Sequence, residues 1–150
     1  MNIEIKLNES IKDSMKNKNN LRLDSLRSIK AAILLEKTKS SHNSILEEKE
    51  IIKILQRLVK QRKDSAKIYL EQDREDLAKI EISQSKIISE FLPDQLSELE
   101  LTEIINNSIS ELNASSMKDM GAVISHVNNK VSGRAEGRLI ADIVKKTLSN

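Results

Sequence analysis

Glycine and proline are so rare in this chain that they restrict its fold before any motif is considered. The 150 residues include three glycines and one proline, and aromatic residues make up only 1%. Sheets built from many short strands need tight turns, and such turns commonly contain glycine or proline. We therefore predict an all-α protein in which long helices are joined by short links and the core is built from Ile, Leu, Val, Ala and Met.

The chain has no cysteine, which excludes disulfides, thiolate metal sites and cysteine nucleophiles. Residues 1–6 lack the uninterrupted apolar run of a signal peptide, and no stretch approaches the roughly 18 apolar residues of a membrane span. We expect a cytoplasmic protein that makes no contact with a membrane.

Apolar residues recur at helical spacing in seven segments, four before Pro93 and three after it. The first four segments are Leu7, Ile11 and Met15; Leu23, Leu26, Ile33 and Leu34; Ile51, Leu55, Leu58, Val59, Ala66 and Tyr69; and Leu77, Ile80, Ile87, Ile88 and Phe91. The last three are Leu101, Ile104, Ile105, Ile109 and Leu112; Met117, Met120, Val123, Ile124 and Val127; and Leu139, Ile140, Ile143 and Val144. We predict an N-terminal four-helix module, residues 1–93, followed by a small three-helix module, residues 94–150.

Several polar residues precede these segments at spacings typical of helix starts. The pairs Ser44 and Glu47, Ser97 and Glu100, and Ser116 and Asp119 are each spaced as a capping box. Asp73 is predicted to cap the fourth helix, and Pro93 is expected to end it, because proline disfavours helical geometry in the preceding residue. The third helix is expected to end near Leu70.

Three polar residues fall within the inward stripes of their helices, namely Lys30, Arg62 and Gln84. A partly buried cation needs a partner, because leaving a buried charge unpaired costs several kcal/mol. We predict that Arg62 reaches Glu81 or forms a hydrogen bond with Gln84.

Candidate catalytic groups are few. The two histidines, His42 and His126, have no further ligands at chelating spacing, and we expect both to be ordinary exposed residues. The acidic clusters at 47–50 and 73–76 lie in first turns of expected helices, where negative charge complements the helix dipole. We predict no catalytic residues, no cofactor and no metal site.

Positive charge is concentrated in the longer module. Residues 1–92 contain 19 Lys and Arg against 15 Asp and Glu, whereas the remainder contains 6 against 8. The outer face of the third helix carries a row of cations: Lys49, Lys53, Arg57, Lys60, Lys63 and Lys67. Such a row can neutralise phosphates of a nucleic acid. The alternative is an ordinary solvated face, since almost no aromatic residues are available to stack on bases.

Residues 130–138, which we call the glycine loop, contain two of the three glycines. Gly133 is expected to adopt a left-handed conformation and Gly137 to allow a close backbone approach. Lys130, Arg134 and Arg138 beside a helix N-terminus would suit a phosphate, although plain turn geometry explains the glycines equally well. Gly121, within the sixth helix, is expected to have a close packing neighbour.

Five motifs in their order and spacing resemble the GatB/YqeY family: VKQRKDS at 59–65, REDL at 74–77, FLPDQL at 91–96, DMG at 119–121 and GRAEG at 133–137. Phe91 stands where tyrosine is common, and Glu136 stands where aspartate is usual.

This resemblance implies two helical modules similar to the tail of the B subunit of the tRNA-dependent amidotransferase, a glutamine-dependent carbon-nitrogen ligase. That tail is thought to grip tRNA, while the chemistry resides in domains that this sequence does not resemble. The resemblance therefore implies a non-catalytic tRNA-binding module, with Lys130, Gly133, Arg134 and Arg138 facing tRNA and amidotransferase subunits as partners. From the cationic row of the third helix we add Lys53, Arg57 and Lys60 as nucleic-acid contacts.

Two other classes of function stay open from the sequence. The protein could be an adaptor that binds a protein partner without touching RNA, or an independent enzyme with a pocket around His126.

Overall fold

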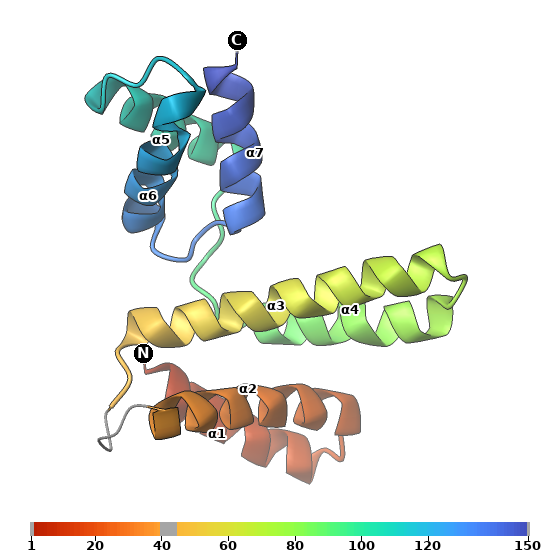
Figure 1. The fold of residues 1–150 in the computed structure, drawn as a ribbon. Coiled ribbons are helices and arrows are strands. Elements are labelled where there is room, and N and C mark those ends of the chain that lie inside the picture. Colours follow the sequence, from red (N-terminus) through yellow and green to blue (C-terminus); the bar gives the residue numbers. More distant parts are fainter. Residues whose placement is uncertain (1, 40–44, 150) are drawn as a thin grey trace. The chain divides into compact units, whose positions relative to one another are not determined.

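The computed structural model describes residues 2–39 and 45–149 (Figure 1). Within these ranges the protein is built of helices and contains no β-strand, which confirms the predicted all-α class. The elements in chain order are α1 (Ile3–Lys16), α2 (Asn20–Lys39), α3 (Glu48–Glu71), α4 (Glu75–Ser89), α5 (Glu98–Glu111), the short 3-10 helix η1 (Met117–Asp119), α6 (Met120–Val131) and α7 (Gly137–Leu148).

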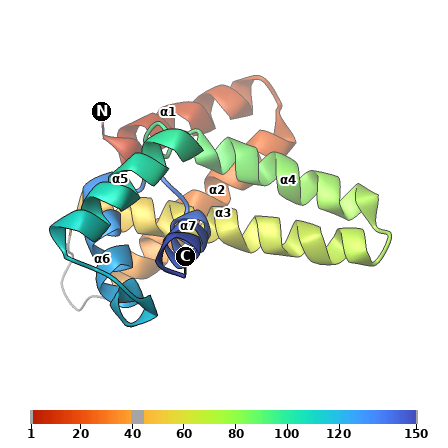
Figure 2. The ribbon, with the colours of Figure 1, turned by 90° about the horizontal axis from the view of Figure 1, so that it is seen from above.

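Contacts between Cα atoms divide the chain into two compact units, Met1–Leu92 and Pro93–Asn150. In the first unit, α3 and α4 form a long antiparallel hairpin, and α2 contacts both of these helices (Figures 1 and 2). Helix α1 packs against α2. The links after α1 and α3 are only three residues long, so each of these helices must pair with its successor in the chain.

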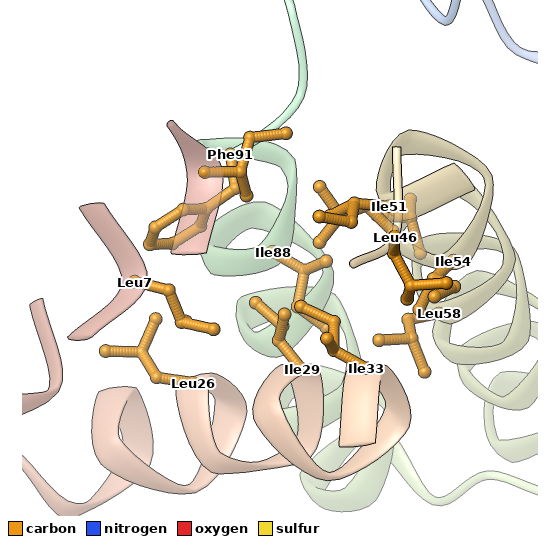
Figure 3. Packing of buried hydrophobic residues seen from close by; sticks show 13 residues of the cluster. Leu7, Leu26, Ile29, Ile33, Leu46, Ile51, Ile54, Leu58, Ile88 and Phe91 are labelled. Carbon is orange, nitrogen blue, oxygen red and sulfur yellow. The ribbon is translucent and has the colours of Figure 1, made fainter. Parts of the chain in front are cut away.

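The core of the first unit joins all four helices (Figure 3). Leu7 of α1 lies near Phe91 and Leu26, while Ile29 and Ile33 of α2 point towards Ile88 of α4. The α3 side of this core is formed by Ile51, Ile54, Leu55, Leu58 and Val59. The 3.6-residue period gathers these aliphatic side chains on one face of each helix, and their burial stabilises the unit by roughly 1.5–3 kcal/mol per large side chain.

The second unit has a separate aliphatic core. Helices α5, α6 and α7 contact one another pairwise. Their buried residues are Leu101, Ile105, Val123, Val127, Val131, Ala135, Ile140, Val144 and Leu148. No aromatic side chain belongs to this core, which is therefore built from small and branched residues at helical spacing.

Several residues predicted to face inward are exposed. Met15, Leu34, Ile80, Leu112 and Met117 are each at least 40% exposed. The apolar stripe of a surface helix is wider than the strip that its neighbours cover, so residues at its margin or beyond the last packed turn remain in water. Lys30 was predicted to face inward and is also exposed, because a long lysine chain carries its ammonium past the apolar margin.

The helix starts differ from the prediction at two places. The N-cap of α3 is Glu47, whose backbone amide donates to Glu50 Oε2 at 2.9 Å, while Ser44 lies outside the described residues. The N-cap of α4 is Arg74, so the assignment of Asp73 was wrong. Asp73 has φ 57°, a left-handed conformation that ends α3 and that Asp tolerates better than most residues.

Other boundaries follow the sequence more closely. Ser97 caps α5 by accepting a hydrogen bond from the amide of Glu100, and Ser116 and Asp119 form the predicted capping box at η1. Helix α3 ends at Glu71, within one residue of the predicted position. Helix α4 ends at Ser89, four residues before Pro93, and the intervening residues form a turn.

Candidate nucleic-acid interface

The outer face of α3 presents Lys53, Arg57 and Lys60, which we call the α3 basic row. These residues are spaced at i, i+4 and i+7, so they lie on one face of the helix and cover an axial length of about 10 Å. All three side chains are exposed, and within the part of the chain that the structure describes none has a carboxylate oxygen within 4.0 Å of its charged nitrogens. The row is therefore open to an anionic partner.

The neighbouring cations of α3 are in different surroundings. Lys49 Nζ lies 3.1 Å from a Glu47 carboxylate oxygen, so its charge is partly neutralised at the start of the helix. Lys67 lies beyond the half-buried Asp64, which interrupts the outer face. The three residues of the α3 basic row are thus the uninterrupted part of the predicted cationic stripe.

Arg62 turns away from this face, as its position in the apolar stripe predicted. Its guanidinium donates to Gln84 Oε1 at 3.2 Å, to the Leu58 carbonyl at 3.2 Å and to Ser28 Oγ at 3.0 Å. The hydrogen bond to Gln84 confirms one of the two predicted partners. Burial lowers the pKa of Arg62, and the negative charge of Glu81 partly offsets this effect. Arg62 thereby ties α2, α3 and α4 together and is not a surface ligand.

In the second unit, Lys130 is ion-paired. Its Nζ lies 3.0 Å and 3.1 Å from the two carboxylate oxygens of Glu111 on α5. The same carboxylate lies 3.4 Å from His126 Nε2. Sequence reasoning missed Glu111, because nothing in the local pattern of α5 indicates a partner on α6 that lies 19 residues further along the chain.

The glycine loop is attached to residues 94–96. Arg134 Nε donates to the Asp94 carbonyl at 3.1 Å, and the Leu96 amide donates to the Arg134 carbonyl at 2.8 Å. Gln95 Nε2 also donates to the Gly133 carbonyl at 3.1 Å. Two of the family motifs, at 91–96 and 133–137, therefore meet in space. Arg134 and Arg138 are both exposed on this loop.

The glycines have different roles from one another. Gly133 has φ 84°, which confirms the predicted left-handed conformation, and Ser132 before it has φ 46°. The predictions for Gly121 and Gly137 were wrong, because a Cβ built on either residue would meet no atom within 4 Å. Both residues lie in the first turn of a helix and on the surface, where the sequence pattern alone does not reveal whether a neighbour is present.

The surroundings of His126 differ from the prediction. His126 is half-buried and its Nδ1 is buried without a hydrogen-bond partner, so the prediction that it is an ordinary exposed residue was wrong. His42 lies outside the described residues. In the ranges 2–39 and 45–149, no group of three or more His, Asp or Glu side chains is arranged to hold a metal ion.

The fold and these surfaces define a class: a small all-helical protein with exposed cations on α3 and an arginine-bearing loop between α6 and α7. Comparison with known families identifies it further. Residues 4–148 match the model of the Yqey-like proteins, so the chain belongs to the YqeY family. This result confirms the YqeY part of the resemblance drawn from the motifs.

One curated relative is similar to most of this chain. The altered inheritance of mitochondria protein 41, mitochondrial, from Clavispora lusitaniae is 31% identical over 129 residues, which cover 84% of this chain and 74% of that protein. The helices of the described ranges do not combine the length and apolar composition that crossing a membrane requires.

Proposed function

We propose that this protein is a non-catalytic module that binds tRNA in the cytoplasm. The observation that carries the proposal is the α3 basic row, in which three exposed cations in register have no carboxylate partner among the described residues. Cations arranged in this way release counterions when they contact phosphates, and this release gives salt-sensitive binding. Arg134 and Arg138 on the glycine loop supply a second set of exposed positive charges.

The resemblance to the tail of the amidotransferase B subunit supports the choice of tRNA over other polyanions. The motifs that resemble the tail of the amidotransferase B subunit include GRAEG at 133–137, which carries Arg134. We propose that residues 94–150 are the tail-like module and residues 1–93 a separate helical module. In this proposal Gly133 shapes the loop, and Arg134 and Arg138 face tRNA. Lys130 contributes to binding only where a tRNA phosphate displaces the Glu111 carboxylate from its ammonium group.

Fluorescence anisotropy with labelled tRNA tests this function. Wild-type protein is expected to bind at about 50 mM salt and to lose most of its affinity at about 200 mM salt. Changing Arg134 and Arg138 together to alanine is expected to weaken binding, and changing both to lysine is the matched control that keeps the charge. The absence of tRNA binding at low salt, or unchanged binding by the alanine variant, would contradict the proposal.

We also propose that the protein associates with amidotransferase subunits. This part of the proposal rests on the resemblance of the motifs to the tail of the amidotransferase, a glutamine-dependent carbon-nitrogen ligase, and the proposed module has no ligase activity of its own. Co-purification with the amidotransferase, retained after nuclease treatment, would support direct contact between the proteins.

A second candidate function, a protein-binding adaptor, is favoured by the far end of the α3–α4 hairpin. Ile68 and Leu70 on α3 and Ile80 on α4 are each at least 46% exposed, so apolar surface faces water there. A pull-down that recovers one protein from nuclease-treated extract, and that fails when these three residues are changed to serine, would favour the adaptor.

A further inference from the structure

The charge of α3 is segregated along the helix. Residues 51–63 contain five basic residues, at positions 53, 57, 60, 62 and 63, and no acidic residue. Arg62 is held inside by Ser28, Gln84 and the Leu58 carbonyl. Four of the five therefore remain exposed, and three of these, Lys53, Arg57 and Lys60, form the α3 basic row, where their charge is not used for the fold.

The spacing of the α3 basic row is rigid. Successive members are four and three residues apart, which corresponds to axial steps of about 6 Å and about 4.5 Å on an α-helix. Their backbone positions belong to the helix that is anchored by Leu55, Leu58 and Val59, all of them buried in the core of the first unit. A partner with fixed phosphate positions matches such a row without first having to be ordered.

The chain has few aromatic side chains on which unpaired bases could stack. Binding of single strands relies on aromatic side chains on which bases stack, and this chain contains only Tyr69 and Phe91. Tyr69 follows Lys60 by nine residues, which places it about 180° around the helix from Lys60 and at least about 120° from the other two members of the row. Phe91 is only 4% exposed and belongs to the core.

In the described part of the second unit, two of the candidate tRNA-facing cations already have partners. Lys130 is held by both carboxylate oxygens of Glu111, and the Nε of Arg134 is used on the Asp94 carbonyl. A phosphate at Lys130 would have to displace a carboxylate, whereas a phosphate at the α3 basic row would displace only water and counterions.

We propose that Lys53, Arg57 and Lys60 form a contact surface for the phosphate backbone of double-helical RNA, so that α3 contacts the stems of a tRNA and not its single-stranded loops. The inference rests on the proposed function and adds the class of RNA structure that the surface recognises. Duplex RNA is bound mainly through its shape and its phosphates, for which a straight row of cations without aromatic residues is suited.

The test uses the 150-residue protein and three labelled probes, namely whole tRNA, an RNA duplex and a single strand of the same length as the duplex. The duplex has about 16 base pairs, which is the length that a double-stranded RNA-binding domain spans. Lys53, Arg57 and Lys60 are changed together to glutamine. The matched control changes Lys12, Lys16 and Lys79, three exposed lysines of the same unit, to glutamine and therefore removes the same charge.

We expect wild-type protein and the control variant to bind tRNA and duplex, and the single strand to bind at least tenfold more weakly. In the row variant, the slope of log affinity against log salt should fall by about 0.9 for each phosphate contact that is lost. If the row variant keeps the melting temperature of the wild type, unfolding is excluded as the cause of weaker binding. A variant in which Lys53 and Lys60 are changed to arginine, and which therefore keeps the positive charge, should bind as the wild type does.

The outcomes separate the two proposals. If wild-type protein binds none of the RNAs, both the proposed function and this inference are wrong. If it binds tRNA but the row variant binds as tightly as the control, only this inference is wrong. Equal affinity for duplex and single strand, or equally effective competition by a polyglutamate peptide, would also overturn the inference, because either result would show general attraction to polyanions.

Discussion

Arg62 illustrates how a residue in a cationic helix is diverted to the interior. Its three hydrogen bonds go to neutral acceptors on α2, α3 and α4, and burial lowers its pKa. The sequence located this residue because it interrupts the stripe of Leu55, Leu58 and Ala66. It also pointed to Gln84, whereas Ser28 could not be foreseen, because the alignment of α2 with α3 depends on the tertiary packing.

Changing Arg62 to methionine is expected to destabilise the protein by about 1 to 2 kcal/mol, since Gln84 and Ser28 would lose a charged partner while remaining partly buried. Arg57 to methionine is the control on the same helix and should change the stability by less than about 0.5 kcal/mol. Urea denaturation followed by circular dichroism measures both. Equal effects of the two changes would show that the Arg62 network does not stabilise the fold.

Gly121 and Gly133 should respond in opposite directions to alanine. A Cβ at Gly121 meets no atom within 4 Å, and the residue is helical, so alanine should stabilise the protein by about 0.5 kcal/mol. Gly133 has φ 84°, where a side chain is strained, and alanine there should cost about 1 to 2 kcal/mol. Thermal melts of the two variants decide this, and a destabilised Gly121 variant would reveal a packing role that its open surroundings do not indicate.

At the scale of elements, the apolar period predicted every α-helix but not every boundary. A buried stripe repeats over several turns, and each turn adds to the signal. A cap is a single residue whose role depends on where the preceding helix stops. Asp73 shows the difference: helix α3 continues to Glu71, so Asp73 takes the left-handed position and Arg74 becomes the cap.

The ion pair between Arg74 and Asp76 at the start of α4 should be visible in the pKa of the Asp76 carboxyl group. Asp76 accepts hydrogen bonds from Arg74 Nε and Nη2, both at 3.1 Å, and these bonds lower the pKa of its carboxyl group. Because the folded-state pKa is below the unfolded value, the ionised form favours the folded state above the unfolded pKa. That contribution is lost as the pH falls through the folded pKa.

NMR titration should give a midpoint for Asp76 below the usual value of about 3.9, and changing Arg74 to glutamine should raise this midpoint. A midpoint at or above 3.9 would refute the hydrogen-bonded geometry.

The start of η1 offers a test of a cap that the sequence did predict. Asp119 accepts hydrogen bonds from the amides of Ser115 and Ser116 at 2.9 Å and 3.3 Å. Replacing Asp119 with alanine leaves these amides to water and should cost about 1 kcal/mol. The Asp119 to asparagine variant keeps an acceptor and should recover part of this stability, as measured by denaturant titration. If asparagine destabilises the protein as much as alanine does, the result would argue against the capping role.

At the scale of the whole molecule, the candidate site was predicted in part. Exposed cations on the outer face of α3 follow from helical periodicity, because the opposite face is apolar. The state of Lys130 does not follow, since its partner Glu111 lies on another helix. Periodicity therefore indicates which cations reach the surface, whereas only the packing of helices determines which of those cations still lack a partner.

The unequal charge of the two units predicts how they divide the affinity for tRNA. Residues 1–92 contain 19 basic and 15 acidic residues, whereas residues 93–150 contain 6 and 8. We expect a fragment of residues 1–92 to keep most of the salt-sensitive binding, and a fragment of residues 93–150 to bind weakly because its net charge repels phosphate. Circular dichroism first establishes that each fragment is helical.

The smaller fragment should melt at the lower temperature, because short chains bury a smaller share of their surface. Stronger tRNA binding by the folded 93–150 fragment would assign the interface to the glycine loop and remove α3 from it.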